Sequence, residues 1–164
     1  MLGNPANPQA GPTTNSERLS SGISLGREPH EPTFTRNGRE LWVTLRGEDR
    51  TAILDVNQAT RQLTGKGEGT AQAVRAYVPT INGPAQVWFS KDGLLAFVIS
   101  QKVAQLKILQ VNPDGNGHSR TKRLRLVDLS AQDKPAFTPF QKLSPDGRQM
   151  WLSHKRAAPA FGKS

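Results

Sequence analysis

The chain has 164 residues, of which 35% are apolar, and its 15 glycines and 12 prolines suit many short strands joined by turns rather than long amphipathic helices. Its 22 Lys and Arg against 13 Asp and Glu give a net charge of +9, which would attract polyanions such as nucleic acid, anionic lipid or an acidic partner. The absence of cysteine excludes disulfides, thiolate catalysis and cysteine-ligated metals.

The first segment, residues 1–17, is rich in Pro and in polar residues such as Asn and Thr, and is predicted to be disordered. It lacks an apolar core of the length that a secretory signal needs, so no signal peptide is visible. Residues 18–25 are expected to form the outer strand of a preceding, mostly missing unit. No membrane span is predicted, because the longest apolar run covers only residues 94–99.

A turn motif then recurs in three segments that align without gaps, at residues 34–44, 89–99 and 143–153. Each has a small hydroxyl residue ahead of Asn-Gly or Asp-Gly, dipeptides that favour tight hairpin turns because they accept positive φ. The glycines are 55 and then 54 residues apart: Gly38, Gly93 and Gly147. An aromatic residue stands four positions after each glycine: Trp42, Phe97 and Trp151. A fixed period of this size indicates a propeller or a solenoid.

More strands are predicted after the first two hairpins. Third strands are expected at residues 51–56 and 103–111, and fourth, outer strands at residues 73–78 and 121–129. The intervening residues 62–70 and 112–118 are interpreted as extended loops at the outer rim.

Four antiparallel strands per repeat form a propeller blade. The predicted fold is therefore all-β, a partial β-propeller of about two and a half four-stranded antiparallel blades that does not close into a ring. The blades occupy residues 18–154, and residues 155–164 form a C-terminal tail without a strand pattern.

The repeats resemble those of YVTN-type (YncE-like) β-propellers. Residues 29–32, Pro-His-Glu-Pro, open the first repeat and residues 53–56 close its third strand, while residues 144–147, Ser-Pro-Asp-Gly, match the turn of the third repeat. The second repeat lacks the opening His and the closing Asp. The resemblance implies a propeller of about seven blades, a periplasmic or secreted location, and a need for the remaining blades or another copy of the chain.

Ligands of propellers usually bind at one mouth of the central channel, on the loops that join one blade to the next. Those loops are expected at residues 26–31, 81–86 and 132–137, and the proline in each limits the entropy lost on ordering. Five residues are predicted to face a shared concave surface that binds an unknown ligand or protein: Arg27, Glu28, His30, Glu31 and Gln86. The alternative is that they only hold adjacent blades together.

His30 has two interpretations. Related haem-binding nitrite-reductase propellers place ligand histidines around the channel, but a histidine that hydrogen-bonds the backbone of a neighbouring blade is favoured here, because no second channel histidine occupies the matching repeat positions. No metal site, cofactor or catalytic residue is predicted. Glu48 and Asp49 are interpreted as solvated loop charges, and residues 65–69 fail the Walker pattern.

The densest basic cluster lies on the predicted outer strand at residues 121–129 and just before it: Arg120, Lys122, Arg123 and Arg125. Alternation places Arg123 and Arg125 on one face, opposite Leu124 and Leu126. This is typical of a solvated outer strand, whose charge discourages edge-to-edge association. The alternative is a stripe that binds polyanions or nucleic acid.

The sequence favours a non-enzymatic binding or scaffold module over an enzyme. The first alternative is part of a haem- or metal-dependent propeller oxidoreductase, and the second is a basic polyanion-binding propeller. Because the third repeat ends after two strands, its open face around Trp151 and Leu152 is predicted to be adhesive, so that the chain aggregates, oligomerises or is marginally stable.

Overall fold

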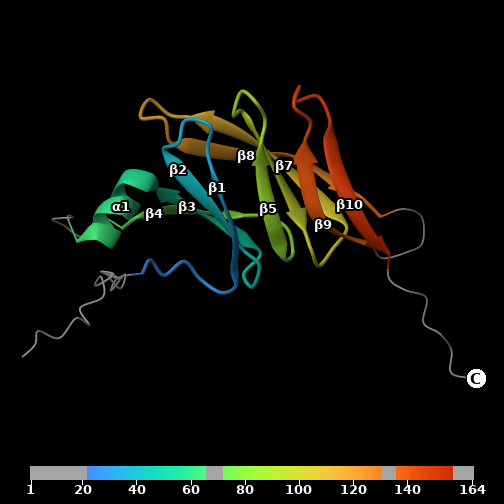
Figure 1. The fold of residues 1–164 in the computed structure, drawn as a ribbon, viewed down its shortest axis with the longest axis horizontal. Helices are drawn as coiled ribbons and strands as arrows, with labels where there is room; N and C mark the ends of the chain where they lie inside the picture. The colour runs from blue at the N-terminus through green and yellow to red at the C-terminus, as the bar shows by residue number, and fades with distance from the viewer. Residues whose placement is uncertain (1–21, 66–71, 131–135, 157–164) are drawn as a thin grey trace, which may run out of the picture.

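The computed structural model describes residues 22–65, 72–130 and 136–156, which form three antiparallel sheets and one helix (Figure 1). Blade 1 contains, in this order, β1 (Pro29–Phe34), β2 (Glu40–Leu45), β3 (Arg50–Asp55) and β4 (Val74–Pro79). Blade 2 contains β5 (Pro84–Phe89), β6 (Leu95–Ser100), β7 (Gln105–Pro113) and β8 (Ser119–Asp128). Blade 3 contains β9 (Ala136–Leu143) and β10 (Met150–Arg156).

This architecture confirms the predicted fold class. The sheets are antiparallel, and two have four strands while the third has two in the described part of the chain. The predicted third and fourth strands are present within a few residues of their expected bounds, and β10 extends two residues into the predicted tail. Residues 1–17 and most of the third mouth loop, residues 132–135, lie outside the described residues.

The three predicted hairpin turns are also confirmed. Gly38, Gly93 and Gly147 have φ of +69°, +76° and +77°, a region that is costly for residues with a Cβ. Each glycine N–H donates to the carbonyl of the hydroxyl residue three positions earlier, at 2.9 Å. In the second turn the hydroxyl of Ser90 also accepts the N–H of Leu95 at 2.9 Å. This side chain therefore links the two ends of the turn.

The repeated aromatic residues of the first two hairpins point toward the following blade. Trp42 is fully buried and meets Phe89 of blade 2 edge-to-face, with ring centroids 5.1 Å apart. Phe97 is partly buried in the apolar cluster between blades 2 and 3, which also includes Leu152. Trp151 has no following blade in the described chain and is 67% exposed. The blade-to-blade contacts therefore form the core, and the largest cluster lies between blades 1 and 2.

The other face of blade 1 is covered by segments that are not strands. Ile23, Leu25 and Ala59 pack on its cluster of buried residues, which are Val43, Leu45, Ala52 and Leu54. Residues 22–26 form no strand, so the predicted outer strand at residues 18–25 is wrong in its described part. The segment lies beside the edge strand β4, and it is held by its apolar side chains and by the hydroxyl of Tyr77, which donates to the carbonyl of Leu25 at 3.2 Å.

The predicted loop at residues 62–70 is also wrong at its start, because helix α1 (Val56–Thr64) occupies residues 56–64. Asp55 caps its N-terminus by accepting the N–H of Gln58 at 2.8 Å, and Gly65 ends it in the left-handed conformation. Residues 66–71 lie outside the described part.

The predicted loop at residues 112–118 is a hairpin turn rather than an extended loop. β7 and β8 continue to Pro113 and from Ser119, so only residues 114–118 make the turn, and the N–H of Gly117 donates to the carbonyl of Asp114 at 2.8 Å. The long repeat period therefore comes from a helix in the first repeat and from longer strands in the second. No helix among the described residues has the length and apolar character needed to cross a membrane.

Candidate functional site

The starts of β1 and β5 lie at the same end of the blades as the β2–β3 turn and the β6–β7 connection, and we call this the mouth end. The N–H of Arg46 in the β2–β3 turn donates to the carbonyl of Glu28 at 3.0 Å. The N–H of Gln101 donates to the carbonyl of Gly83, just before β5, at 3.1 Å. Connections from both complete blades thus meet here.

Three of the five predicted mouth residues lie on strands rather than on loops. β1 begins at Pro29 and β5 at Pro84. His30, Glu31 and Gln86 are therefore among the first residues of these strands and do not belong to the connecting loops. Both strands carry a β-bulge at this level, and bulges occur where a strand re-aims its side chains. Only Arg27 and Glu28 precede the strand.

The structure brings His30, Glu31 and Gln86 together across the first blade interface. Nε2 of Gln86 donates to Oε2 of Glu31 at 2.7 Å, and Nδ1 of His30 lies 2.9 Å from the carbonyl of Ala85. The second contact is the backbone hydrogen bond that was favoured for His30. Gln86 also accepts the N–H of Gln141 in blade 3 at 3.0 Å, so it links all three blades.

These contacts hold adjacent blades together and still leave part of the group accessible. His30 is exposed and Glu31 is half-buried, whereas Gln86 is 9% exposed. The bond through Nδ1 fixes the orientation of the His30 ring, and its other nitrogen remains the one through which this side chain can meet a ligand. Ligand binding by these residues stays a prediction.

Arg46 joins Glu28 to blade 2. Its Nε lies 3.1 Å from Oε2 of Glu28, and its Nη1 donates to Oε1 of Gln101 at 3.0 Å. Nζ of Lys102 donates to the carbonyl of Arg46 at 3.3 Å. Sequence inspection missed Arg46, Gln101 and Lys102, because residues in turns carry no periodic signal that would point to them.

Glu48 and Asp49 lie in the β2–β3 turn, as interpreted, and Asp49 is exposed, but both side chains also make contacts. Glu48 accepts the N–H of Arg27 at 2.7 Å and pairs with Arg50, and Asp49 accepts the N–H of Gly83 at 2.9 Å. The hydrogen bond from Arg27 is the main reason why the pKa of Glu48 lies below its ordinary value. Both carboxylates therefore fix the backbone at the mouth end.

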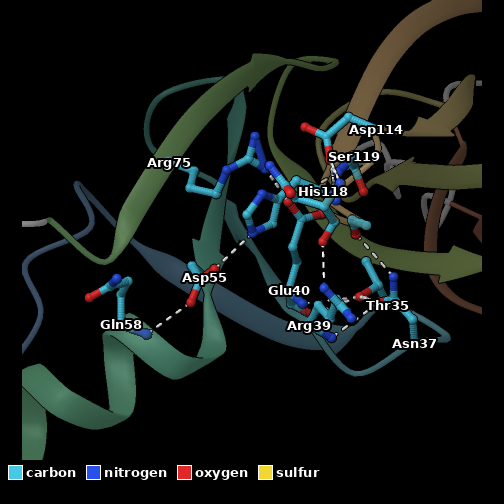
Figure 2. A network of polar contacts seen from close by, with 12 residues as sticks. Thr35, Asn37, Arg39, Glu40, Asp55, Gln58, Arg75, Asp114, His118 and Ser119 are labelled. Atoms are coloured by element: carbon cyan, nitrogen blue, oxygen red, sulfur yellow. Dashed lines mark hydrogen bonds and ion pairs between the residues drawn. The ribbon is translucent and has the colours of Figure 1, made fainter.

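The opposite end holds a second polar network, shown in Figure 2, that the sequence did not indicate. Glu40 is fully buried, pairs with Arg75 and accepts the N–H of Ser119 through both oxygens at 3.1 Å. Nearby, Nε2 of His118 lies 2.8 Å from Oδ2 of Asp55. Because His118 and Ser119 belong to blade 2 and the other three residues to blade 1, the network joins the outer hairpin of one blade to the other.

The turn of the first repeat takes part in this joint. Asn37 donates to the carbonyl of Gly117 at 3.0 Å, and Nη1 of Arg39 donates to that of Asn116 at 2.6 Å. The Asn-Gly turn thus contacts the next blade in addition to reversing the chain. With each buried oxygen of Glu40 satisfied by donors, the network is suited to structural support rather than acid–base chemistry.

The four basic residues of β8 are all exposed but do not lie as predicted. A β-bulge leaves Leu124 without a partner, so Arg125 pairs with Ile108 while Arg123 pairs with Leu109. Neighbouring residues of a strand point to opposite faces, and Arg123 and Arg125 are therefore on opposite faces. The face of Arg125 instead carries the partners of Gln110 and Asn112, which are Lys122 and Arg120.

No group of three or more His, Cys, Asp or Glu side chains that could hold a metal occurs among the described residues. No family model matches the chain, and no curated protein matches it.

Solved structures do match. A periplasmic gluconolactonase of Pseudomonas aeruginosa aligns with a TM-score of 0.63 and 20% identity, over 79% of this chain and 34% of the other. A protein from Lactobacillus plantarum aligns with a TM-score of 0.61 and 22% identity, over 79% and 35%. Kuenenia stuttgartiensis hydrazine synthase aligns with a TM-score of 0.55 and 13% identity, over 83% and 32%. At these identities the likeness shows the fold alone, which is a β-propeller, and the chain spans about a third of each structure.

Proposed function

We propose that the chain is part of a YVTN-type propeller that works as a non-enzymatic binding or scaffold module, and that its partner binds at the mouth end. The observation that carries the proposal is the contact of Gln86 with Glu31 beside the exposed ring of His30. Polar groups from two blades meet there on rigid strands, and rigid strands position binding groups better than loops do. The repeat resemblance supports a location in the bacterial envelope.

The fixed backbone around these residues supports binding as well. Arg46 bridges Glu28 and Gln101, and Glu48 holds the N–H of Arg27, so the mouth end carries charges of both signs in defined positions. A preorganised surface loses little conformational entropy when a partner binds. Charges of both signs suit a polar ligand or a protein surface better than a simple polyanion.

Thermal unfolding of the full chain against a panel of peptides, sugar acids and sugar lactones tests this function. A ligand that raises Tm should lose its effect in His30→Ala and in Glu28→Ala. The same ligand should keep its effect in Arg61→Ala. This substitution removes an exposed charge from α1, which follows the end of β3 that lies opposite the mouth end. Stabilisation that survives both mouth substitutions would contradict a site at the mouth end.

The enzyme alternative, a haem- or metal-dependent propeller oxidoreductase, has its own test. The contact between Nδ1 of His30 and a backbone carbonyl is also the arrangement that orients many metal-bound histidines. A Soret band, or stoichiometric metal that is lost in His30→Ala, would favour this alternative. Because one similar structure is a gluconolactonase, hydrolysis of gluconolactone is a further assay, and turnover that His30→Ala or Glu31→Gln abolishes would favour an enzyme.

The polyanion alternative rests on the row formed by Arg120, Lys122 and Arg125. These three exposed side chains share one face of β8, as the strand register requires. The face is turned toward blade 3, where the described chain has no third or fourth strand beside it. A row of this kind binds phosphates through charge alone, and salt dependence is its signature.

A further inference from the structure

A pocket of about 560 Å³ lies at the outer rim of blade 1, where three parts of the chain meet. They are the segment before β1, the last turn of α1, and β4, which Figure 1 shows gathered at the end of the molecule away from blade 3. The volume lies within the range of about 300–1,000 Å³ that is typical of small-molecule sites. None of the residues assigned above to the mouth end lines this pocket, so it is a separate feature of the blade.

The walls of the pocket are held in place by contacts within blade 1. Ile23 packs on the apolar cluster of this blade together with Leu25. The hydroxyl of Tyr77 in β4 donates to the carbonyl of Leu25 at 3.2 Å, which fastens the segment to the strand. The cap provided by Asp55 fixes the helix that carries Gln62. A ligand would therefore cost the protein little conformational entropy on binding.

The polar groups of the pocket are neutral. Among the described residues that line it, only Arg75 carries a charge, and its guanidinium is paired with the buried carboxylate of Glu40. Three further polar side chains are exposed and have no hydrogen-bond partner among the described residues: Ser24, Gln62 and Gln72. An amide or a hydroxyl can both donate and accept, so these side chains suit a ligand whose own groups do both.

Apolar groups lie between these polar ones. Ile23 and Val74 line the pocket, and both are half-buried against the apolar cluster of blade 1. Tyr77 is 41% exposed, and Arg50 covers one face of its ring, with the guanidinium carbon 3.9 Å from the ring centroid. Because the Tyr77 hydroxyl donates to Leu25, its oxygen still has the capacity to accept. The pocket thus combines aliphatic and aromatic carbon with neutral donors and acceptors.

From this combination we propose that the pocket binds the ring of a neutral saccharide. Each hydroxyl of a sugar both donates and accepts, as the amides of Gln62 and Gln72 do, and the CH groups of the ring need the apolar contact that Val74 and Ile23 offer. A small anion would instead require an unpaired positive charge, and the charge of Arg75 is already paired.

The free edge of β4 does not suit an extended peptide, which is the other ligand that an outer strand could bind. A peptide that adds to a sheet needs a regular row of backbone N–H and C=O groups. A bulge interrupts the register of β4 on β3 between Ala76 and Val74, and Pro79 has no N–H to donate. Side chains, rather than the strand edge, therefore supply the hydrogen bonds of this pocket.

Tyr77 makes the proposal directly testable, because it is the only tyrosine in the chain and therefore gives a signal from this pocket alone. The full chain, labelled with ¹³C in the tyrosine ring, is titrated with methyl α-glucopyranoside and with N-acetylglucosamine and followed by NMR. The ring signal should shift and saturate with a Kd on the order of 1 mM, which is usual for ligands of this size.

Substitutions of the two glutamines identify the contacts. Gln62→Ala and Gln72→Ala should each weaken binding about threefold to tenfold, because each removes one neutral hydrogen bond. Gln149→Ala removes the same side chain from an exposed position between β9 and β10, and this matched control should leave the Kd unchanged. All three positions are exposed, and circular dichroism of each variant checks that the fold is kept.

Four results would overturn the proposal. The first is a Tyr77 signal that neither saccharide moves at about ten times the expected Kd. The second is a shift that Gln62→Ala and Gln72→Ala leave unchanged, which would place the sugar outside the pocket. The third is an equal shift with sorbitol, which has similar hydroxyls but no ring. The fourth is saturation by citrate or by a short extended peptide but not by either saccharide, which would mean that the pocket binds an anion or a strand.

Discussion

Arg75 is the only partner of opposite charge that the structure gives to the buried carboxylate of Glu40 among the described residues. Removing one partner of a buried ion pair leaves a charge that neither water nor a counter-ion stabilises. The single N–H of Ser119, which both oxygens of Glu40 share, remains, and it reduces the cost only in part.

We therefore expect Arg75→Ala to lower the free energy of unfolding by about 3 kcal/mol. Urea unfolding at neutral pH measures this change. Arg61→Ala, which removes an exposed arginine from α1, should change it by less than about 0.5 kcal/mol. Equal effects of the two substitutions would mean that Glu40 is reached by water in solution.

Asp55 makes the free energy of unfolding depend on pH in the acid range. Burial alone would raise its pKa, but the N–H of Gln58 and the ring of His118 outweigh that effect, and the pKa lies below its ordinary value of 3.8. Because the pKa is lower in the folded chain than in the unfolded chain, the stabilisation is complete above pH 3.8 and is lost as the pH falls through the folded value.

Asp55→Asn should flatten this acid limb, since asparagine keeps the helix cap but does not titrate. Urea unfolding of both proteins between about pH 5 and pH 2 follows the change. The two curves should converge as the pH falls. Parallel curves over this interval would show that Asp55 has the same pKa in both states.

At the scale of elements, helix α1 and the bulge in β8 are two features that differ from the prediction. Asp55 as a helix cap, Gly65 ten residues later, and apolar Val56, Ala59 and Leu63 on one helical face were all present in the sequence. The glycine-rich residues that follow obscured them. In β8 the alternation of charged and apolar residues is correct on each side of Leu124. A bulge at that residue, however, places the residues after it on the opposite faces of the sheet from those predicted. A pattern of alternating residues does not reveal where a bulge occurs.

The bulge supplies a matched control for polyanion binding. If the basic row binds a short DNA duplex, Arg120→Ala, Lys122→Ala and Arg125→Ala should each weaken binding and reduce the slope of log K against log salt by about 0.9. Arg123→Ala removes the same charge from the opposite face and should have a smaller effect. Fluorescence anisotropy over a salt series measures both quantities, and equal losses at all four positions would indicate attraction by net charge alone.

At the scale of the whole molecule, stability comes from contacts between blades. Trp42 and Trp151 occupy equivalent positions in their hairpins, yet one is fully buried and the other 67% exposed. The same residue type in the same local structure thus differs only in whether another blade covers it.

Trp42→Ala should therefore lower the free energy of unfolding by about 4 kcal/mol, because it opens a cavity between blades 1 and 2. Trp151→Ala should lower it by less than about 1 kcal/mol. The comparison is made by urea unfolding at concentrations low enough for the chain to be monomeric. A similar cost at both positions would mean that blade 3 is covered even in the monomer.

The sequence by itself determined the strands, the three hairpins and the number of repeats. These features depend on local chemistry: Asn-Gly and Asp-Gly accept positive φ, and alternation marks strands with one covered face. It also led correctly to the backbone hydrogen bond of His30. That interpretation followed from the absence of a histidine at the matching positions of the other two repeats.

Only the tertiary structure decided which side chains meet between blades. Glu40 and Ser119 are 79 residues apart, and Arg46 and Gln101 are 55 apart, so no local pattern connects them. The segment at residues 22–26 and helix α1 take their places from the apolar face of blade 1, which exists only once the strands have assembled. Contacts of this kind depend on how twisted sheets stack, and that stacking is a property of the folded chain rather than of any segment within it.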